Sequence, residues 1–218
     1  MLMSMDRELL QIIGVTLRMS FFSTLISCLV GMPLGVLLGK SSFKGKGTIV
    51  KLTGTFMGLP PVVAGLIVYM LFSKNGILGS LNLLFTVDVM VIAQCMLIIP
   101  VVINLTNSIT CVNASPLLET AKGLNFSRSK TAHLMLTENK TALFSVVLTA
   151  FGRSIAEVGA VSLVGGNVQW KTRVMTTAIM LETNKGNFSF ALALGTILLL
   201  ISFIVNAVAS FAVKEDKR

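Results

Sequence analysis

Five stretches of this chain are long and apolar enough to cross a lipid bilayer, and this feature limits the fold more than any other. A membrane-spanning helix needs about 20 predominantly apolar residues, because the hydrocarbon core is about 30 Å thick. We therefore expect an all-α, polytopic membrane protein with about five transmembrane helices. The expected spans run approximately over residues 15–39, 52–72, 87–106, 142–164 and 188–213.

The composition agrees with a chain that lies in lipid. Hydrophobic residues make up 54% of the 218 residues and charged residues 12%, and the mean hydropathy is +0.85. A soluble domain of this length needs more polar surface than that. No polar block or linker divides the sequence, so residues 1–218 are expected to form a single transmembrane domain.

The basic residues predict an orientation. A net charge of +9 would suggest nucleic acid in a soluble protein, but basic residues accumulate in the cytoplasmic loops of membrane proteins, and we expect no nucleic-acid partner. The segments 40–51, 107–141 and 214–218 carry eleven Lys and Arg, whereas the segments on the other side carry five. The first set is expected in the cytoplasm, which places the N-terminus outside and the C-terminus inside.

Two expected spans contain features that suggest a gate. Pro60-Pro61 should kink or break the second span, either as part of a pore or as a plain packing kink. Arg153 and Glu157 stand four residues apart in the fourth span and should share a helix face. They are interpreted as a structural ion pair or a gate latch, in preference to a direct substrate site, although a lining of an anion path stays open.

The fourth span ends at Gly165-Gly166-Asn167. The glycines permit a sharp turn whose backbone N–H groups could meet an oxyanion. With Arg173 nearby, the segment is interpreted as a docking surface, a short gate helix or a simple helix terminator.

Other patterns predict packing between helices. Gly31, Gly35 and Gly39 lie on one face of the first span and allow another helix to approach closely. Gln94 and Asn206 are expected to form hydrogen bonds between helices.

The segment from about residue 107 to 141 is long for a connector. Ser115-Pro116 is expected to start a helix, Gly123 and Asn125 to end it, and a second helix to run from residue 130 into the fourth span. Such a helix could carry force from a soluble partner, or merely cover the bundle.

No set of residues for catalysis or metal binding is evident. The three cysteines lie far apart, and no Ser-His-Asp set or pair of catalytic carboxylates occurs. The segment Gly35–Ser41 has three residues between its glycines, where a phosphate-binding loop has four, and it ends an apolar span. We expect no enzyme, no metal and no cofactor on this chain, so any ATP must be used by a partner.

The stretch LLETAKGLNFSRSKTAHL resembles the coupling-loop motif of ABC importer permeases, which begins Glu-Ala-Ala and has Gly six residues after the Glu. The resemblance implies that this loop forms a cytoplasmic coupling helix that contacts the ATPase. The matching positions are Glu119, Thr120, Ala121, Lys122, Gly123 and Asn125, with Asn125 in place of the Gly.

A broader resemblance covers most of the chain. MGLPPVVAGL, LFSKNGILG, AQCMLIIPVV, AFGRSIAEVGAVSLVGGN and TRVMTTAIMLETNKGNF resemble, in this order, the tungstate-type permeases of binding-protein-dependent importers. The resemblance implies the type I permease fold in a prokaryotic inner membrane. It also implies a homodimer, a cytoplasmic dimer of ABC ATPase subunits and an extracytoplasmic oxyanion-binding protein.

We therefore expect the permease of an ATP-driven importer for tungstate or a similar oxyanion such as molybdate, working by alternating access. The alternatives are a permease for another small anion and an ion-gradient-driven secondary transporter. The second alternative would need intramembrane carboxylates or an inverted repeat, and neither is evident.

Overall fold

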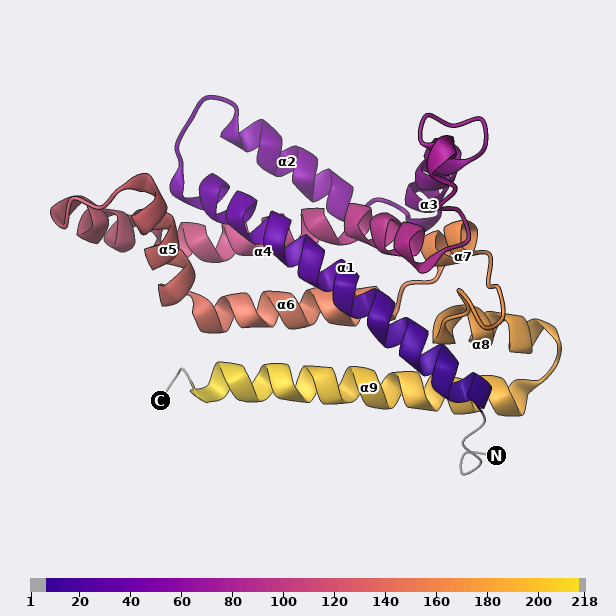
Figure 1. The fold of residues 1–218 in the computed structure, drawn as a ribbon. Helices are drawn as coiled ribbons and strands as arrows, with labels where there is room; N and C mark the ends of the chain where they lie inside the picture. Colours follow the sequence, from indigo (N-terminus) through magenta and orange to yellow (C-terminus); the bar gives the residue numbers. More distant parts are fainter. Residues whose placement is uncertain (1–6, 216–218) are drawn as a thin grey trace.

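The computed structural model describes residues 7–215, apart from the side chains of residues 128, 206 and 209–215. All regular elements in the described part are helical (Figure 1). They are α1 (Arg7–Lys40), α2 (Lys46–Met57), α3 (Pro61–Phe72), the short 3-10 helix η1 (Gly79–Leu81), α4 (Val87–Gly123), α5 (Arg128–Glu138), α6 (Lys140–Ile155), α7 (Gly159–Gly165), α8 (Met175–Asn184) and α9 (Phe188–Glu215).

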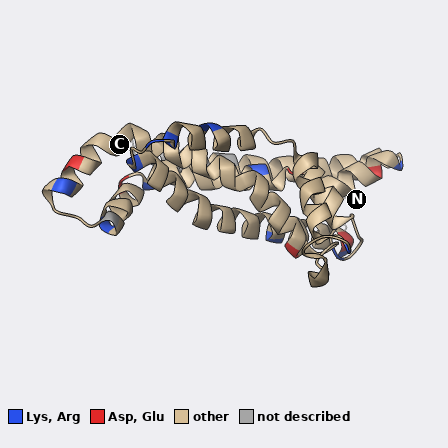
Figure 2. Cartoon of the chain, turned by 90° about the horizontal axis from the view of Figure 1, so that it is seen from above, with Lys and Arg blue, Asp and Glu red and all other residues tan. Residues whose placement is uncertain are grey.

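The helices form an elongated bundle. α1 packs along α4 and crosses α6, and α6 lies between α4 and α9 (Figure 1). α5 and the α1–α2 loop lie at one end of the bundle, together with the end of α9, whereas the start of α1, η1 and α8 lie at the other. Figure 2 shows mostly basic residues at the first end and a mixture of basic and acidic residues at the second. We call them the basic end and the opposite end.

The described residues contain three helices that could cross a membrane, and up to five spans if each of two bent helix pairs counts as one. α1, α4 and the described part of α9 are each long and apolar enough to cross a membrane. The pair α2 and α3 passes the same test with a bend of 95°, and the pair α6 and α7 with a bend of 56°. The break at Pro60-Pro61 is therefore confirmed, because Pro61 begins α3 and a proline has no N–H to continue the preceding helix.

The continuous fourth span expected from the sequence is wrong. α6 ends at Ile155 and α7 begins at Gly159, so the bend lies at residues 156–158. Neither side of this bend carries a proline; the contacts that hold it come from α3 and α8, as described below.

The helix start expected at Ser115-Pro116 is also wrong, since α4 runs through both residues to Gly123. Pro116 removes the hydrogen bond to the carbonyl of Val112. Val112 is 82% exposed, so water can replace that bond and the helix continues. The helix expected from residue 130 into the fourth span is likewise divided, because Asn139 ends α5 and precedes α6.

The glycine stripe of α1 packs against α4, as the sequence predicts. A Cβ atom added to Gly31, Gly35 or Gly39 would lie 2.8, 2.6 or 2.5 Å from the nearest side-chain atom of α4. Those atoms belong to Val102, Thr106 and Thr110. The two backbones can approach this closely only because α1 has no side chain at these positions.

A buried hydrogen-bond network joins three helices. Ser154 Oγ on α6 lies 2.7 Å from Ser23 Oγ on α1 and donates to Gln94 Oε1 on α4 at 2.9 Å. Gln94 Nε2 returns a bond of 2.8 Å to the Ser154 carbonyl. The interhelical role predicted for Gln94 is confirmed, whereas the Asn206 side chain lies outside the described residues. The network fixes α6 to the α1–α4 pair.

Candidate functional site

The two broken spans meet at their breaks. A Cβ added to Gly159, the first residue of α7, would lie 3.1 Å from Val62 Cγ2 and 3.3 Å from Pro61 Cβ at the start of α3. One turn further along, a Cβ on Gly65 would lie 2.7 Å from Ala160 Cα. We call residues 57–61 together with 153–160 the break junction.

Arg153 ties the two broken spans together. Its Nη2 donates to the carbonyl of Met57 at 3.3 Å, and the side chain is half-buried. Met57 is the last residue of α2, so its carbonyl is one of those that a helix end leaves without an internal partner. A cation at that position also complements the negative end of the helix dipole.

Glu157 lies in the bend itself and its side chain caps the N-terminus of α7. Its Oε1 accepts a hydrogen bond of 3.1 Å from the N–H of Ala160, in the first turn of α7. Its own carbonyl accepts one of 2.9 Å from Thr176 Oγ1 on α8. A carboxylate at a helix N-terminus satisfies a free donor and complements the helix dipole.

The ion pair expected between Arg153 and Glu157 is therefore wrong. The bend of 56° falls between the two residues, so they do not share a helix face. Each has a partner elsewhere, and among the described residues the ion pairs are Arg173–Glu8 and Lys185–Glu182. A role for Arg153 and Glu157 in a gate stays a prediction.

The sharp turn expected at Gly165-Gly166-Asn167 is present. Gly166 and Asn167 both have left-handed backbones, with φ of 66° and 51°. However, the Gly166 N–H donates to Ser162 O and the Val168 N–H to Thr172 Oγ1. These two groups are already bonded within the protein, which argues against the oxyanion-binding interpretation for them.

Arg173 holds the start of α1. Its Nη1 lies 2.7 Å from Glu8 Oε1, and its side chain is only 13% exposed. The residue is thus fastened within the chain instead of forming a free docking surface.

The turn from α8 to α9 is fixed in a similar way. Glu182 accepts hydrogen bonds of 2.9 Å from Lys185 Nζ and from Asn187 Nδ2. The hydrogen bond from Lys185 lowers the pKa of the Glu182 carboxyl.

The coupling motif forms a projecting turn at the basic end. Glu119, Thr120, Lys122 and Gly123 are exposed in the last turns of α4, whereas Ala121 is 2% exposed. Asn125 has a left-handed φ of 51°, as its position in the motif predicts.

Hydrogen bonds close this α4–α5 turn. The Phe126 N–H donates to the Ala121 carbonyl at 2.8 Å, and Ser127 Oγ accepts from the Lys130 N–H at the start of α5. Beside the turn lies a cavity of about 660 Å³ that reaches the α1–α2 loop and includes Phe43 and Leu118 in its lining. The turn is thus a preformed element that another protein can contact.

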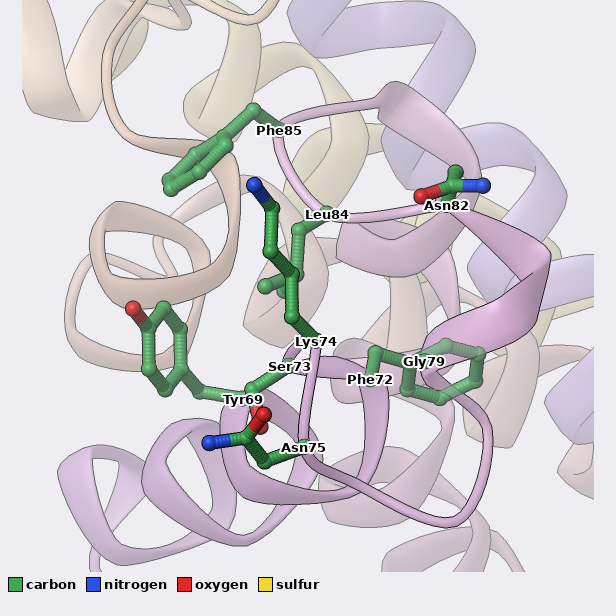
Figure 3. A pocket seen from close by; sticks show the side chains of 9 residues that line it. All are labelled: Tyr69, Phe72, Ser73, Lys74, Asn75, Gly79, Asn82, Leu84 and Phe85. Carbon is green, nitrogen blue, oxygen red and sulfur yellow. The ribbon is translucent and has the colours of Figure 1, made fainter.

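A hollow at the opposite end was not predicted from the sequence. It has a volume of about 480 Å³ and lies where α3 passes into the loop before α4 (Figure 3). Its lining consists of Tyr69, Phe72, Ser73, Lys74, Asn75, Gly79, Asn82, Leu84 and Phe85.

No group of three or more His, Cys, Asp or Glu that could hold a metal ion occurs within residues 7–215 as far as they are described. The features that the structure does bring together are the break junction, the α4–α5 turn and the hollow.

Comparison with known proteins identifies relatives of similar length. The chain is 38% identical over 216 residues to the tungstate uptake system permease protein TupB of Peptoclostridium acidaminophilum, which covers 99% of this chain and 94% of that protein. It is 41% identical over 207 residues to TupB of Campylobacter jejuni, covering 94% and 86%.

The fold is similar to a chain in the crystal structure of inward-facing conformations of the MetNI methionine ABC transporter. The TM-score is 0.77 at 14% sequence identity, and the match covers 99% of each chain. Residues 31–214 also match the family model described as binding-protein-dependent transport system inner membrane component. This chain therefore belongs to the family of inner membrane components of binding-protein-dependent transport systems.

Proposed function

We propose that this chain is the membrane-spanning permease of an ATP-driven importer for tungstate or a similar tetrahedral oxyanion such as molybdate. The observation that carries the proposal is the identity to two tungstate uptake permeases across nearly the whole chain. ATP is hydrolysed by a separate subunit, in keeping with the sequence of this chain, in which no nucleotide-binding motif is evident.

In the proposed assembly two copies of the chain line a path. A pair of cytoplasmic ATPase subunits contacts the α4–α5 turn through Glu119 and Lys122, and an oxyanion-binding protein docks at the opposite end. The clustering of basic residues around α5 supports a cytoplasmic position for that end, with the N-terminus outside.

The break junction is the proposed gate. Closure of the ATPase subunits moves the α4–α5 turn and tilts α4. Ser154 and Gln94 pass this tilt to α6, and Arg153 connects the end of α6 with the end of α2. A broken span changes its bend more easily than an intact helix, because the regular i→i−4 hydrogen bonds of the helix are interrupted at the break. Pro60, Pro61 and Gly159 would then act as hinge positions, and the turn at 165–167 as the outer pivot.

Uptake by proteoliposomes tests this proposal. The chain is reconstituted with the proposed partner ATPase and binding protein, and entry of radiolabelled tungstate is followed. Uptake should require ATP and both partners, and unlabelled molybdate should compete. Uptake by the chain alone, driven by a proton or sodium gradient, would favour the secondary transporter instead. Calorimetry of the binding protein with each oxyanion separates tungstate from molybdate.

Cysteine labelling tests the orientation. In a background that lacks the exposed Cys111, Lys122→Cys should react with an impermeant maleimide only after the membrane is opened. Ile77→Cys, at the opposite end, should react in intact cells. The reverse pattern would place the α4–α5 turn outside and remove the basis for coupling.

A further inference from the structure

The hollow at the opposite end has walls from α3 and from the α3–α4 loop, which reaches α7 through Phe85. Tyr69 and Phe72 belong to α3, and Figure 3 shows the Lys74 side chain extending past Leu84 toward the Phe85 ring. Phe85 is fastened to α7, because its N–H donates to the Val164 carbonyl at 3.0 Å. A Cβ on Gly166 would lie 2.6 Å from the Phe85 ring, so the two are in close contact.

The loop that forms the hollow is held in shape by its own backbone. The Gly76 N–H donates to Ser73 O at 2.8 Å, and the Leu78 N–H donates to Leu71 O at 2.9 Å. Added Cβ atoms on Gly76 and Gly79 would collide with backbone carbonyls of residues 70–74. A preformed surface loses little conformational entropy on binding a partner, which favours tight association.

The loop that follows α3 is unusually apolar for an exposed loop. Ile77, at the tip of the loop, is 88% exposed, and Leu81 is 55% exposed. Within the hollow, aromatic rings stand beside Lys74. Aromatic and aliphatic groups around a small number of charges are typical of the centre of a protein–protein interface.

Among the described cations at this end that have no ion pair, such as Lys171, Lys74 is the one that lines the hollow. Arg173 is paired with Glu8 and Lys185 with Glu182, whereas Lys74 is exposed and has no ion-pair partner among the described residues. A cation that the chain leaves unpaired in a shaped hollow is complementary to a carboxylate on a partner.

We propose that this hollow is a docking point for the extracytoplasmic binding protein and that it receives an Asp or Glu side chain of that protein beside Lys74. The inference rests on the proposed function, which requires such a partner at this end. Ile77 would pack on the surface around that carboxylate. A docked protein would touch α3 directly and α7 through Phe85, so both broken spans would meet the same partner.

A matched set of charge variants tests the inference. The complex with its ATPase is placed in nanodiscs, and the affinity for the proposed partner binding protein is measured at low salt. Lys74→Glu should weaken binding about tenfold or more, because it places like charges together. Lys74→Arg should stay within about threefold of the parent, because it keeps the positive charge. Lys171→Glu is the control, as it makes the same charge change on an exposed lysine of the α7–α8 loop.

Carbodiimide cross-linking supplies a second readout that does not depend on affinity. The reagent joins a lysine amine to a contacting carboxylate with loss of water. Mass spectrometry should find Lys74 joined to an Asp or Glu of the binding protein. The cross-link should disappear in Lys74→Arg although binding persists, since a guanidinium does not react.

The outcomes separate the inference from the function on which it rests. Binding that is unchanged in Lys74→Glu, or reduced equally in Lys171→Glu, would overturn the hollow as a docking point while leaving the importer intact. If Lys74→Glu leaves the affinity for the binding protein unchanged and weakens only the attachment of the complex to vesicles of anionic lipid, Lys74 contacts the lipid surface. This result would also overturn the proposal. If the parent complex itself fails to bind the protein, the proposed function fails.

Discussion

Substitution of Gly35 by alanine should loosen the bundle, although alanine is the better helix former. The added Cβ would lie 2.6 Å from Thr106 Cβ and 2.8 Å from the Ile103 carbonyl oxygen. Because carbon atoms in contact settle at about 3.5–4.0 Å, α1 and α4 must separate locally by about 1 Å.

The expected magnitude follows from two opposing effects. Overpacking of this kind costs about 1–3 kcal/mol. Replacement of a helical glycine by alanine returns up to about 1 kcal/mol. A net loss of about 1–2 kcal/mol should lower Tm by about 2–8 °C in a chain of this size.

The assay is thermal unfolding of the purified chain in one detergent, with Gly14→Ala as the matched control. Gly14 lies in the same helix and has no heavy atom within 4 Å of an added Cβ. The Tm of the Gly14→Ala variant should therefore equal that of the parent chain or exceed it slightly. Thr106→Gly combined with Gly35→Ala should recover part of the loss in a double-mutant cycle. Equal Tm values for Gly35→Ala and Gly14→Ala would refute the close approach of the two helices.

Three further substitutions test the proposed coupling and gate. Glu119→Lys should leave the chain folded but reduce ATP-dependent uptake at least about tenfold, because it reverses a charge on the surface proposed to contact the ATPase. Arg153→Gln should reduce uptake and lower Tm by a few degrees, since a hydrogen bond from a charged group contributes about 1.5–3 kcal/mol and the carbonyl of Met57 loses its partner. Ser154→Ala should cost about 1–3 kcal/mol in thermal unfolding, because it leaves Gln94 Oε1 buried without its donor.

Each variant has a control at a comparable position. Glu138→Lys reverses an exposed charge at the basic end outside the coupling motif and should transport normally. Arg153→Lys keeps the charge and should recover part of the activity. Ser145→Ala removes a hydroxyl from the same helix whose bond is a local one to Thr141 O. If these controls behave like the test variants, the assigned contacts are not the cause.

Much of the fold could be predicted because its signals are local. The apolar stretches gave the spans, and Pro60-Pro61 marked one break through the chemistry of the residue itself. The spacing of Gly31, Gly35 and Gly39 predicted a close helix contact, and the left-handed conformation of Asn125 follows from its place in the coupling motif.

The second break could not be predicted because its causes are distant in sequence. The bend at residues 156–158 depends on Gly159 meeting Pro61 and on Thr176 binding the Glu157 carbonyl. The four-residue spacing predicted a shared helix face for Arg153 and Glu157. This prediction was wrong because no residue near the bend, such as a proline, indicates it in the sequence.

The hollow could not be predicted either, because it also depends on contacts between residues that are distant in sequence. Its walls come from the end of α3, from the loop after it and from Phe85, whose position is set by α7. Each residue looks ordinary for a loop between two helices. Only the packing of α3 against α7 brings these residues together around the hollow.

The length of α1 has a mechanical consequence. With 34 residues it measures about 50 Å, well beyond the hydrocarbon core of about 30 Å. It is locked to α4 along the glycine stripe and pinned to the α7–α8 loop by the pair of Glu8 and Arg173. If α1 tilts as one rigid body about its centre, a tilt of about 5° moves each end of the helix sideways by about 2 Å. A movement of α1 at one end of the bundle would then be accompanied by a movement of α1 at the other end.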